Sequence, residues 1–215
     1  MADWGRGRAV RTIDPGGARI AIGRQWPMDL GWSVKKSKVA WRGRFPVVED
    51  LLAADHDGRE HLYTYLGIRS TAVGILAVGD DGRLLLIDEY RHPLGRVVTD
   101  IPMGSAERGE DPAEAASREL REETGWSAGS LESIGGIYPV PALTALRFEF
   151  FLARELTKGV AEPDETELIA VRWMEAGAVL AGVLSGEFEH GGLPLALTLA
   201  LRKGLLEIPD GGGSA

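Results

Sequence analysis

Short runs of alternating or continuous apolar residues, separated by Gly, Asp and Pro, fill most of the chain and predict a protein rich in β-strands. Two C-terminal segments, 175–188 and 193–206, instead have apolar positions that favour helices. Residues 1–30 show no sustained period. The predicted strands cover residues 32–41, 45–51, 60–69, 71–78, 83–90, 131–140, 148–154 and 168–174, and residues 157–167 are expected to form an acidic loop.

The order of these elements predicts an α+β protein with two parts. The three strands between residues 32 and 69 are expected to form a small antiparallel accessory sheet. The later strands need helices over the faces of their sheet, which predicts a sandwich of helices around mixed strands. We therefore assign residues 1–68 to an N-terminal segment with the accessory sheet, 69–208 to the main domain, and 209–215, which end in GGGSA, to a disordered tail.

One short helix between the strands is bounded by its own capping residues. Asp111 is a favourable N-cap residue and Pro112 suits the first helical position, while Gly125 supplies a C-terminal stop. Ala116 and Leu120 are one turn apart and mark the side expected to be buried. These signals predict a helix over residues 112–124.

The same helix carries a concentration of acids. Glu119, Glu122 and Glu123 are spaced by three and four residues, which places three carboxylates on one face close to the negative end of the helix dipole. This arrangement is unfavourable by itself, so a cation is expected there. Carboxylate oxygens without cysteine or histidine suit Mg²⁺ or Mn²⁺ better than zinc. Arg118 is placed to hold a ligand carboxylate in position.

Composition narrows the class of protein. The chain has 215 residues, enough for one sizeable domain or for a domain with a smaller accessory part. Its net charge of −8 argues against a nucleic-acid surface, and the lack of cysteine removes disulfides and thiolate metal sites. The sequence shows neither a signal-peptide core nor an apolar run of membrane length, so a cytoplasmic protein is expected.

The acidic helix and the residues before it also follow a known spacing. The stretch from Gly104 to Trp126 resembles a Nudix box, Gx5Ex7REUxEExGU, in which U is a bulky apolar residue. An exposed acidic helix would explain the acids but not the glycines at both ends. The resemblance implies a Nudix fold, a mixed β-sheet in an α/β/α sandwich, and metal-assisted cleavage of a diphosphate linked to another group. The matching positions are Gly104, Glu110, Arg118, Glu119, Leu120, Glu122, Glu123, Gly125 and Trp126.

Residues around the box extend the resemblance to about residues 35–205 and towards one group of the family. An accessory sheet, then LLLIDEYRHPLG, then DIPMG directly before the box is an order similar to that of the ADP-ribose pyrophosphatases. This group also has a proline shortly after the box, and Pro141 stands at that position. Asp100 and Met103 depart from the usual glutamate and alanine of this group, and Ala142 stands where glycine is common. These departures affect the expected substrate more than the expected reaction.

The resemblance also assigns roles to residues outside the helix. It implies that Arg91 grips the substrate's phosphates, that Met103 gives its backbone carbonyl to a metal, and that Glu165 and Glu167 act as catalytic base and metal ligand. The alternatives are an ordinary surface arginine and a solvated acidic loop. The predicted set is catalytic Glu165, Glu122 and Arg118; substrate-binding Arg91, Trp41, Tyr65 and Met103; and metal-binding Met103, Glu119, Glu122, Glu123 and Glu167.

Substrate and partners follow from the same resemblance. Adenine recognition needs an aromatic platform, for which Trp32, Trp41, Tyr63 and Tyr65 are candidates. The resembling enzymes exchange the accessory sheet across a homodimer, so a homodimer is expected. The implied reaction is Mg²⁺-dependent hydrolysis of ADP-ribose, or of a related nucleoside diphosphate sugar, to AMP and ribose 5-phosphate, with Mn²⁺ as a substitute ion. Alternatives are GDP-mannose or a dinucleotide as substrate, or a sensor that binds without cleaving; neither nucleic acid nor a membrane is an expected partner.

Overall fold

The computed structural model describes residues 31–54, 57–161 and 168–208. The chain divides into two compact units. One comprises Met1–Ile68 with Val140–Ala145, and the other comprises Arg69–Pro139 with Leu146–Ala215. Each unit has its own β-sheet.

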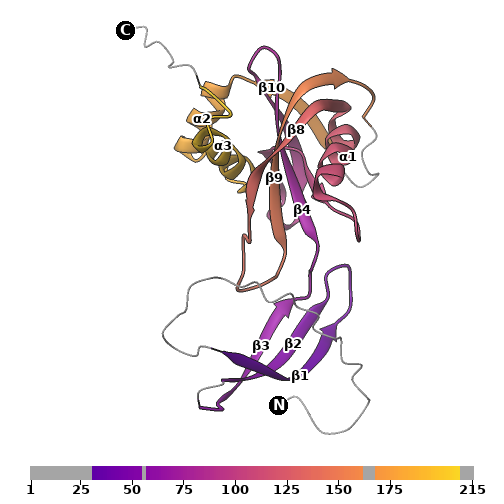
Figure 1. Ribbon diagram of the computed structural model, residues 1–215, viewed down its shortest axis with the longest axis vertical. Coiled ribbons are helices and arrows are strands. Elements are labelled where there is room, and N and C mark those ends of the chain that lie inside the picture. The colour runs from indigo at the N-terminus through magenta and orange to yellow at the C-terminus, as the bar shows by residue number, and fades with distance from the viewer. Residues whose placement is uncertain (1–30, 55–56, 162–167, 209–215) are drawn as a thin grey trace. The chain divides into compact units, whose positions relative to one another are not determined.

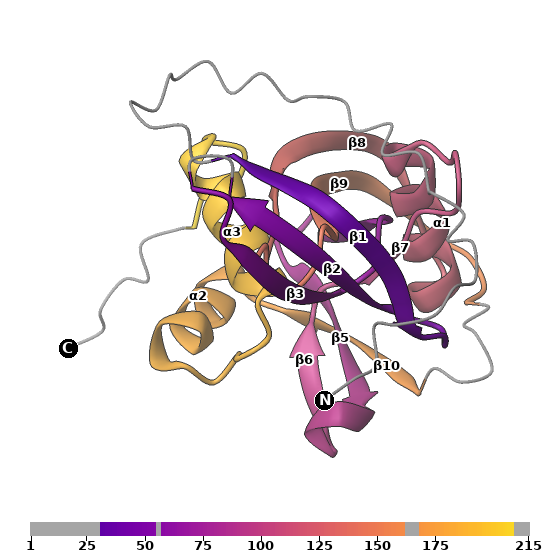
Figure 2. The ribbon, with the colours of Figure 1, turned by 90° about the horizontal axis from the view of Figure 1, so that it is seen from below.

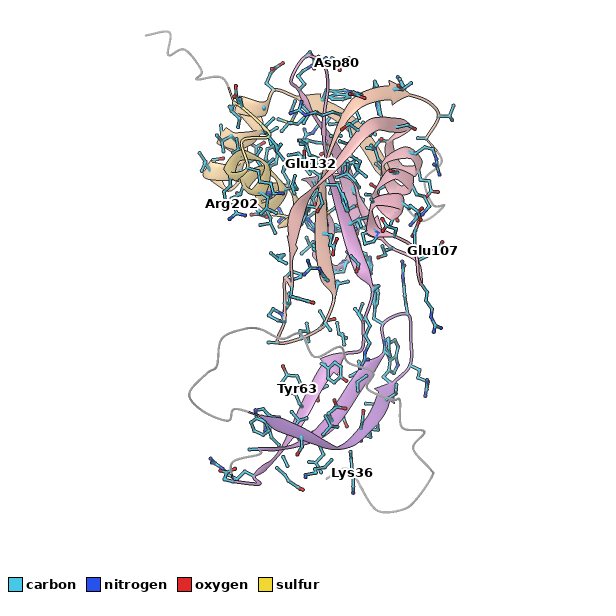
Figure 3. The ribbon with its side chains drawn as sticks, in the orientation of Figure 1. Lys36, Tyr63, Asp80, Glu107, Glu132 and Arg202 are labelled. Atoms are coloured by element: carbon cyan, nitrogen blue, oxygen red, sulfur yellow. The ribbon has the colours of Figure 1, made fainter. Side chains whose placement is uncertain are left out.

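The first unit is a three-stranded antiparallel sheet. Its strands are β1 (Trp32–Trp41), β2 (Val47–Ala54) and β3 (Glu60–Leu66), in the spatial order β1-β2-β3. The segment Val140–Ala145 joins this unit through β3. The Leu66 N–H donates to the Leu143 carbonyl at 2.8 Å, and the hydroxyl of Tyr63, labelled in Figure 3, donates to the carbonyl of Ala142.

The second unit is a larger mixed sheet with helices on both sides. The strands run in the order β10-β5-β4-β9-β8, with β6 paired to β5 and β7 paired to β4, and only β4 and β9 are parallel among these pairs. Helix α1 lies on one side of the sheet, and α2 and α3 lie on the other (Figures 1 and 2). The elements are β4 (Thr71–Val78), β5 (Leu84–Arg91), the 3-10 turn η1 (His92–Leu94), β6 (Arg96–Asp100), β7 (Met103–Ser105), α1 (Pro112–Thr124), β8 (Trp126–Ile137), β9 (Arg147–Lys158), β10 (Ile169–Met174), α2 (Ala176–Ser185) and α3 (Gly192–Arg202).

The core consists of two apolar clusters, one on each face of this sheet. Val73 and Ile75 of β4 pack with Leu120 of α1, while Leu76 packs with Leu197 of α3, and all five side chains are fully buried or nearly so. Successive residues of β4 therefore face opposite helices. This double burial explains why β4 is a continuous apolar run rather than an alternating one.

The α+β prediction with a small antiparallel sheet and a larger mixed sheet is confirmed, but several predicted boundaries are wrong. Strand β8 begins at Trp126 instead of residue 131, and β9 continues to Lys158, through the start of the predicted 157–167 loop. The two strands pair along their whole length, from Trp126↔Lys158 to Ile137↔Phe148, so cross-strand hydrogen bonds stabilise polar residues in the strand conformation. Strands β6 and β7 were not predicted, and α3 ends at Arg202 instead of residue 206. In the described part of the chain, no helix is both long and apolar enough to cross a membrane.

Candidate active site

Helix α1 has the predicted limits because its ends are satisfied locally. The Asp111 side chain accepts a hydrogen bond from the Ala113 N–H at 2.8 Å, which caps the first turn. Gly125 adopts the left-handed conformation, with φ of 74°, and its N–H donates to the Arg121 carbonyl at 2.8 Å. Leu120 is fully buried against the sheet. The burial of Leu120 fixes the rotation of the helix, and Glu119 and Glu123 then lie on the flank beside Leu120 that faces β7.

Two of these acids meet the backbone of β7. The Ser105 N–H donates to Glu119 Oε1 at 3.2 Å, and the Met103 N–H donates to Glu123 Oε2 at 3.1 Å. Glu123 is only 3% exposed. Hydrogen bonds to the charged form of a carboxylate offset part of the cost of burying it. The short strand β7 thus orients both carboxylates.

Gly104, between those two donors, leaves the space that Glu119 occupies. A Cβ atom on Gly104 would lie 1.9 Å from Glu119 Cδ and 2.1 and 2.3 Å from its two carboxylate oxygens. Gly104 pairs with Val73 of β4, so the backbone at this position is held by the sheet. The first glycine of the box is therefore explained by close approach of a carboxylate to the main chain.

Arg118 donates hydrogen bonds to five acceptor atoms, which belong to four residues. Its Nε and Nη2 donate to the two carboxylate oxygens of Glu110, each at 3.0 Å, and its Nη1 donates to Glu119 at 2.9 Å and to Glu122 at 3.1 Å. Its Nη2 also donates to the Ser105 carbonyl at 3.1 Å. Such a planar fork of donors matches carboxylate oxygens closely. Arg118 thus connects the loop before α1, the acidic face of α1 and β7.

The same contacts shift two pKa values. Hydrogen bonds from the Arg118 side chain, followed by one from the Glu107 N–H, hold the pKa of Glu110 below its usual value. Glu107, labelled in Figure 3, lies in the loop before α1, and its N–H donates to Glu110 Oε2 at 2.7 Å. The pKa of Arg118 is raised, first by its hydrogen bonds with Glu110. Both shifts favour the charged pair, so the Glu110–Arg118 contact is ionic at neutral pH.

We expect Arg118→Lys to lower both stability and activity. A single ammonium group cannot replace a fork that serves Glu110, Glu119 and Glu122 together. Losing charge-assisted hydrogen bonds here should lower the melting temperature by about 3–10 °C. Turnover should fall about tenfold, as when a residue that orients a metal ligand is replaced. Thermal melts and initial rates measure the two effects.

Arg121→Lys is the matched control for this substitution. Arg121 lies on the same helix, is more exposed, and has one long contact of 3.5 Å with Glu122. Its replacement should leave both quantities near the wild-type values. Equal losses in the two variants would contradict the role of Arg118 as the centre of the network.

The oxygen atoms that could bind a metal beside β7 are chemically suited to a hard divalent ion. Glu119, Glu123 and the Met103 carbonyl provide only oxygen ligands, which Mg²⁺ and Mn²⁺ prefer. Glu122 is directed to Arg118 and Arg121 instead of to the β7 backbone. Within residues 31–54, 57–161 and 168–208, no three His, Cys, Asp or Glu side chains form a preformed metal cluster. The predicted ligand Glu167 and the predicted base Glu165 lie outside the described residues.

Arg91 lies at the end of β5, just before the η1 turn. Its Nη2 forms an ion pair with Glu89 Oε2 at 2.7 Å, and Glu89 itself is largely buried. The Nε atom of Arg91 is also buried, and no acceptor for it occurs among the residues that the structure describes. Arg91 is therefore held by Glu89, and its predicted phosphate contact stays a prediction.

Trp41 and Tyr65 lie in the first unit, on β1 and β3. Trp41 is 58% exposed and covers Gly43, whereas Tyr65 is half-buried beside Tyr63, with ring centroids 6.3 Å apart. Their predicted contact with adenine stays a prediction.

Sequence reasoning missed the parts played by Glu110 and Ser105. Glu110 matched the box without an assigned role, although its fixed spacing from Arg118 was a usable signal. Ser105 contributes only its backbone, with its N–H donating to Glu119 and its carbonyl accepting from Arg118, so no side-chain pattern indicates it.

The fold and this site agree with a comparison with known families. Residues 68–190 match the NUDIX domain family. The chain therefore belongs to the Nudix hydrolase family, and the resemblance found in the sequence is confirmed. Nudix hydrolases generally use divalent metal ions, in keeping with the oxygen donors beside β7.

Particular relatives point to one group within this family. An ADP-ribose pyrophosphatase of Bacillus subtilis (strain 168) is 40% identical over 102 residues, which are 46% of this chain and 55% of that protein. The ADP-ribose pyrophosphatase of Mycobacterium tuberculosis is 31% identical over 120 residues, 54% of this chain and 58% of that protein. The chain thus spans somewhat over half the length of these relatives. A crystal structure of ADP compounds hydrolase matches with a TM-score of 0.73 and 25% identity, covering 81% of this chain and 94% of that chain.

Proposed function

We propose that the protein is a Mg²⁺-dependent pyrophosphohydrolase that cleaves ADP-ribose, or a related nucleoside diphosphate sugar, to AMP and ribose 5-phosphate. The observation that carries this proposal is the pair Glu119 and Glu123, held by the β7 backbone with Arg118 beside Glu119. A Nudix box that had lost its function would not need to hold these two carboxylates in fixed positions by hydrogen bonds. The similarity to ADP-ribose pyrophosphatases supports the choice of substrate.

The residues of α1 and β7 would hold the ion and keep its ligands in place. Glu119, Glu123 and the Met103 carbonyl are the proposed ligands, with Glu122 and Glu167 as further ones. When bound, such an ion supplies positive charge that neutralises the diphosphate and makes a water molecule more acidic. Arg118 keeps Glu119 in place through a 2.9 Å hydrogen bond, so the ligand is oriented before an ion arrives.

The remaining steps fall to residues outside the box. We assign Glu165 as the base that removes the proton from water as it attacks one phosphorus in line with the leaving oxygen. Arg91, whose guanidinium is already oriented by Glu89, is assigned to the phosphate oxygens. Trp41 and Tyr65 are assigned to the adenine.

A substrate panel tests the proposed function. The purified chain, with Mg²⁺, is incubated with ADP-ribose, GDP-mannose, NADH and diadenosine polyphosphates, and the released nucleotides are identified by chromatography. We expect AMP and ribose 5-phosphate from ADP-ribose as the fastest reaction. Faster release of GMP from GDP-mannose would replace the substrate but keep the reaction. Binding of ADP-ribose without any hydrolysis would identify a sensor.

We also propose that the protein is a homodimer formed through its three-stranded sheet. Trp32, Val34, Trp41 and Leu62 of this sheet are exposed, although large apolar side chains are usually covered when they occur together in a small sheet. Sedimentation velocity at micromolar concentration should give a dimer. A monomer under these conditions would contradict the proposal.

A further inference from the structure

Asp100, the last residue of β6, is a buried carboxylate outside the proposed catalytic set. It is 1% exposed. Its Oδ1 accepts hydrogen bonds from the Ile101 N–H at 2.9 Å and from the Leu193 N–H at 2.7 Å, and its Oδ2 contacts His190 Nδ1. Leu193 lies in the first turn of α3. A residue of β6 therefore caps a helix that begins more than ninety positions later in the sequence.

Helix α3 depends on this distant carboxylate because its own N-cap cannot supply one. The N-cap residue is Gly191, and no side chain of the helix caps its first turn. A carboxylate that accepts a hydrogen bond from a helix N-terminus is favoured both by the charge-assisted bond and by the helix dipole. The contact between Asp100 and Leu193 thus holds the end of β6 against the start of α3.

This contact adjoins the strand that orients the proposed metal ligands. A Cβ atom on Gly192, the first residue of α3, would lie 2.4 Å from Met103 Sδ and 2.8 and 2.9 Å from the two carboxylate oxygens of Asp100. The start of α3, Asp100 and Met103 therefore pack without spare space. Met103 then donates its N–H to Glu123. A short, closely packed path runs from Asp100 through Met103 to that carboxylate.

We propose that Asp100 is a positioning residue for the metal site. Its carboxylate, fixed by α3 and His190, sets the course of the chain from residue 101 to Ser105, and this course places the two N–H groups that orient Glu119 and Glu123. Asp100 itself binds neither the ion nor the substrate. The inference rests on the proposed function in so far as Glu119 and Glu123 are the ligands.

Binding of Mn²⁺ to the ion-free full-length protein, followed by electron paramagnetic resonance of the free ion, tests this role without catalysis. Asp100→Asn keeps the shape of the side chain but removes its charge and turns an amide N–H₂ group or oxygen towards His190. Gly192→Ala keeps the charge of Asp100 and instead forces Asp100 and Met103 apart. We expect the dissociation constant for Mn²⁺ to rise about tenfold in both variants, as for other residues that orient metal ligands.

Asp88→Asn is the matched control. Asp88 lies on β5, opposite Thr99, the neighbour of Asp100 in β6. It accepts a hydrogen bond from Thr99 Oγ1 at 2.6 Å and pairs with Arg172 of β10 at 3.2 Å, so these contacts lie on β6 and β10 and not on α3 or β7. Its replacement should lower the melting temperature without changing the Mn²⁺ dissociation constant by more than about twofold. If Asp100 had a purely structural role, Asp100→Asn would likewise lower the melting temperature and leave the Mn²⁺ dissociation constant unchanged.

The possible outcomes distinguish a failure of the proposed function from a failure of the positioning role of Asp100. Wild-type protein that binds no Mn²⁺ would overturn both the proposed function and the positioning role. Wild-type binding with an unchanged dissociation constant in folded Asp100→Asn would overturn the positioning role alone. If Asp100→Asn fails to fold, Gly192→Ala decides, and an unchanged dissociation constant in that variant overturns the role. At saturating Mn²⁺ both folded variants should regain most of the wild-type kcat, because the ligands themselves are intact.

Discussion

Replacing Glu119 or Glu123 by glutamine is expected to lower kcat by about 10²–10³-fold, the loss typical of removing one charge-stabilising group from an active site. Glutamine has nearly the same shape and retains an oxygen that can accept the N–H of Ser105 or Met103, so each side chain should keep its place on β7. Only the charge is lost. The measurement is kcat with ADP-ribose and Mg²⁺, together with thermal melts that show an intact fold.

Glu132→Gln is the matched control for these two variants. Glu132, labelled in Figure 3, lies on β8 and is exposed, so its replacement removes the same charge from the chain without touching α1 or β7. We expect its kcat to equal that of the wild type. Normal turnover in either Glu119→Gln or Glu123→Gln would remove the central pair from the mechanism.

The limits of α1 could be predicted from the sequence because every signal for them is local. Asp111 caps a donor two residues away, and Gly125 closes the last turn on a carbonyl four residues before it. The direction of the acidic face then follows from helical spacing and from the burial of Leu120. Local geometry is therefore enough to place Glu119 and Glu123 on one face of the helix, without any tertiary contact.

The surroundings of those acids could not be predicted in the same way. The donors on Met103 and Ser105 are backbone groups of a three-residue strand, which leaves no pattern of side chains. The contact of Asp100 with Leu193 joins residues 93 positions apart, so no periodicity relates them. The sequence also suggested three equivalent acids, whereas Glu122 pairs with arginines on its own helix. Residue spacing alone cannot distinguish a carboxylate that accepts hydrogen bonds from the sheet from one that pairs with arginines of its own helix.

Replacing Gly104 by alanine should lower kcat by about 10²-fold, since a displacement of roughly 1 Å in a catalytic geometry has an effect of this size. The added Cβ would lie 1.9 Å from Glu119 Cδ, and the pairing of β7 with β4 prevents the backbone from yielding. The end of the glutamate side chain is flexible, so it should move away while the fold persists. Initial rates and Mn²⁺ titrations measure the loss.

Two controls test whether Gly104→Ala acts by displacing Glu119: the same substitution at another glycine, and a double variant with Glu119→Gln. Gly177 lies in α2, where the nearest atom to an added Cβ is Ile208 Cγ2 at 3.7 Å, so Gly177→Ala should keep full activity and an equal or higher melting temperature. If Gly104→Ala acts through Glu119, adding it to Glu119→Gln should reduce kcat little further, because the two changes disable the same ligand. Fully multiplicative losses in the double variant would show that Gly104 acts through another residue.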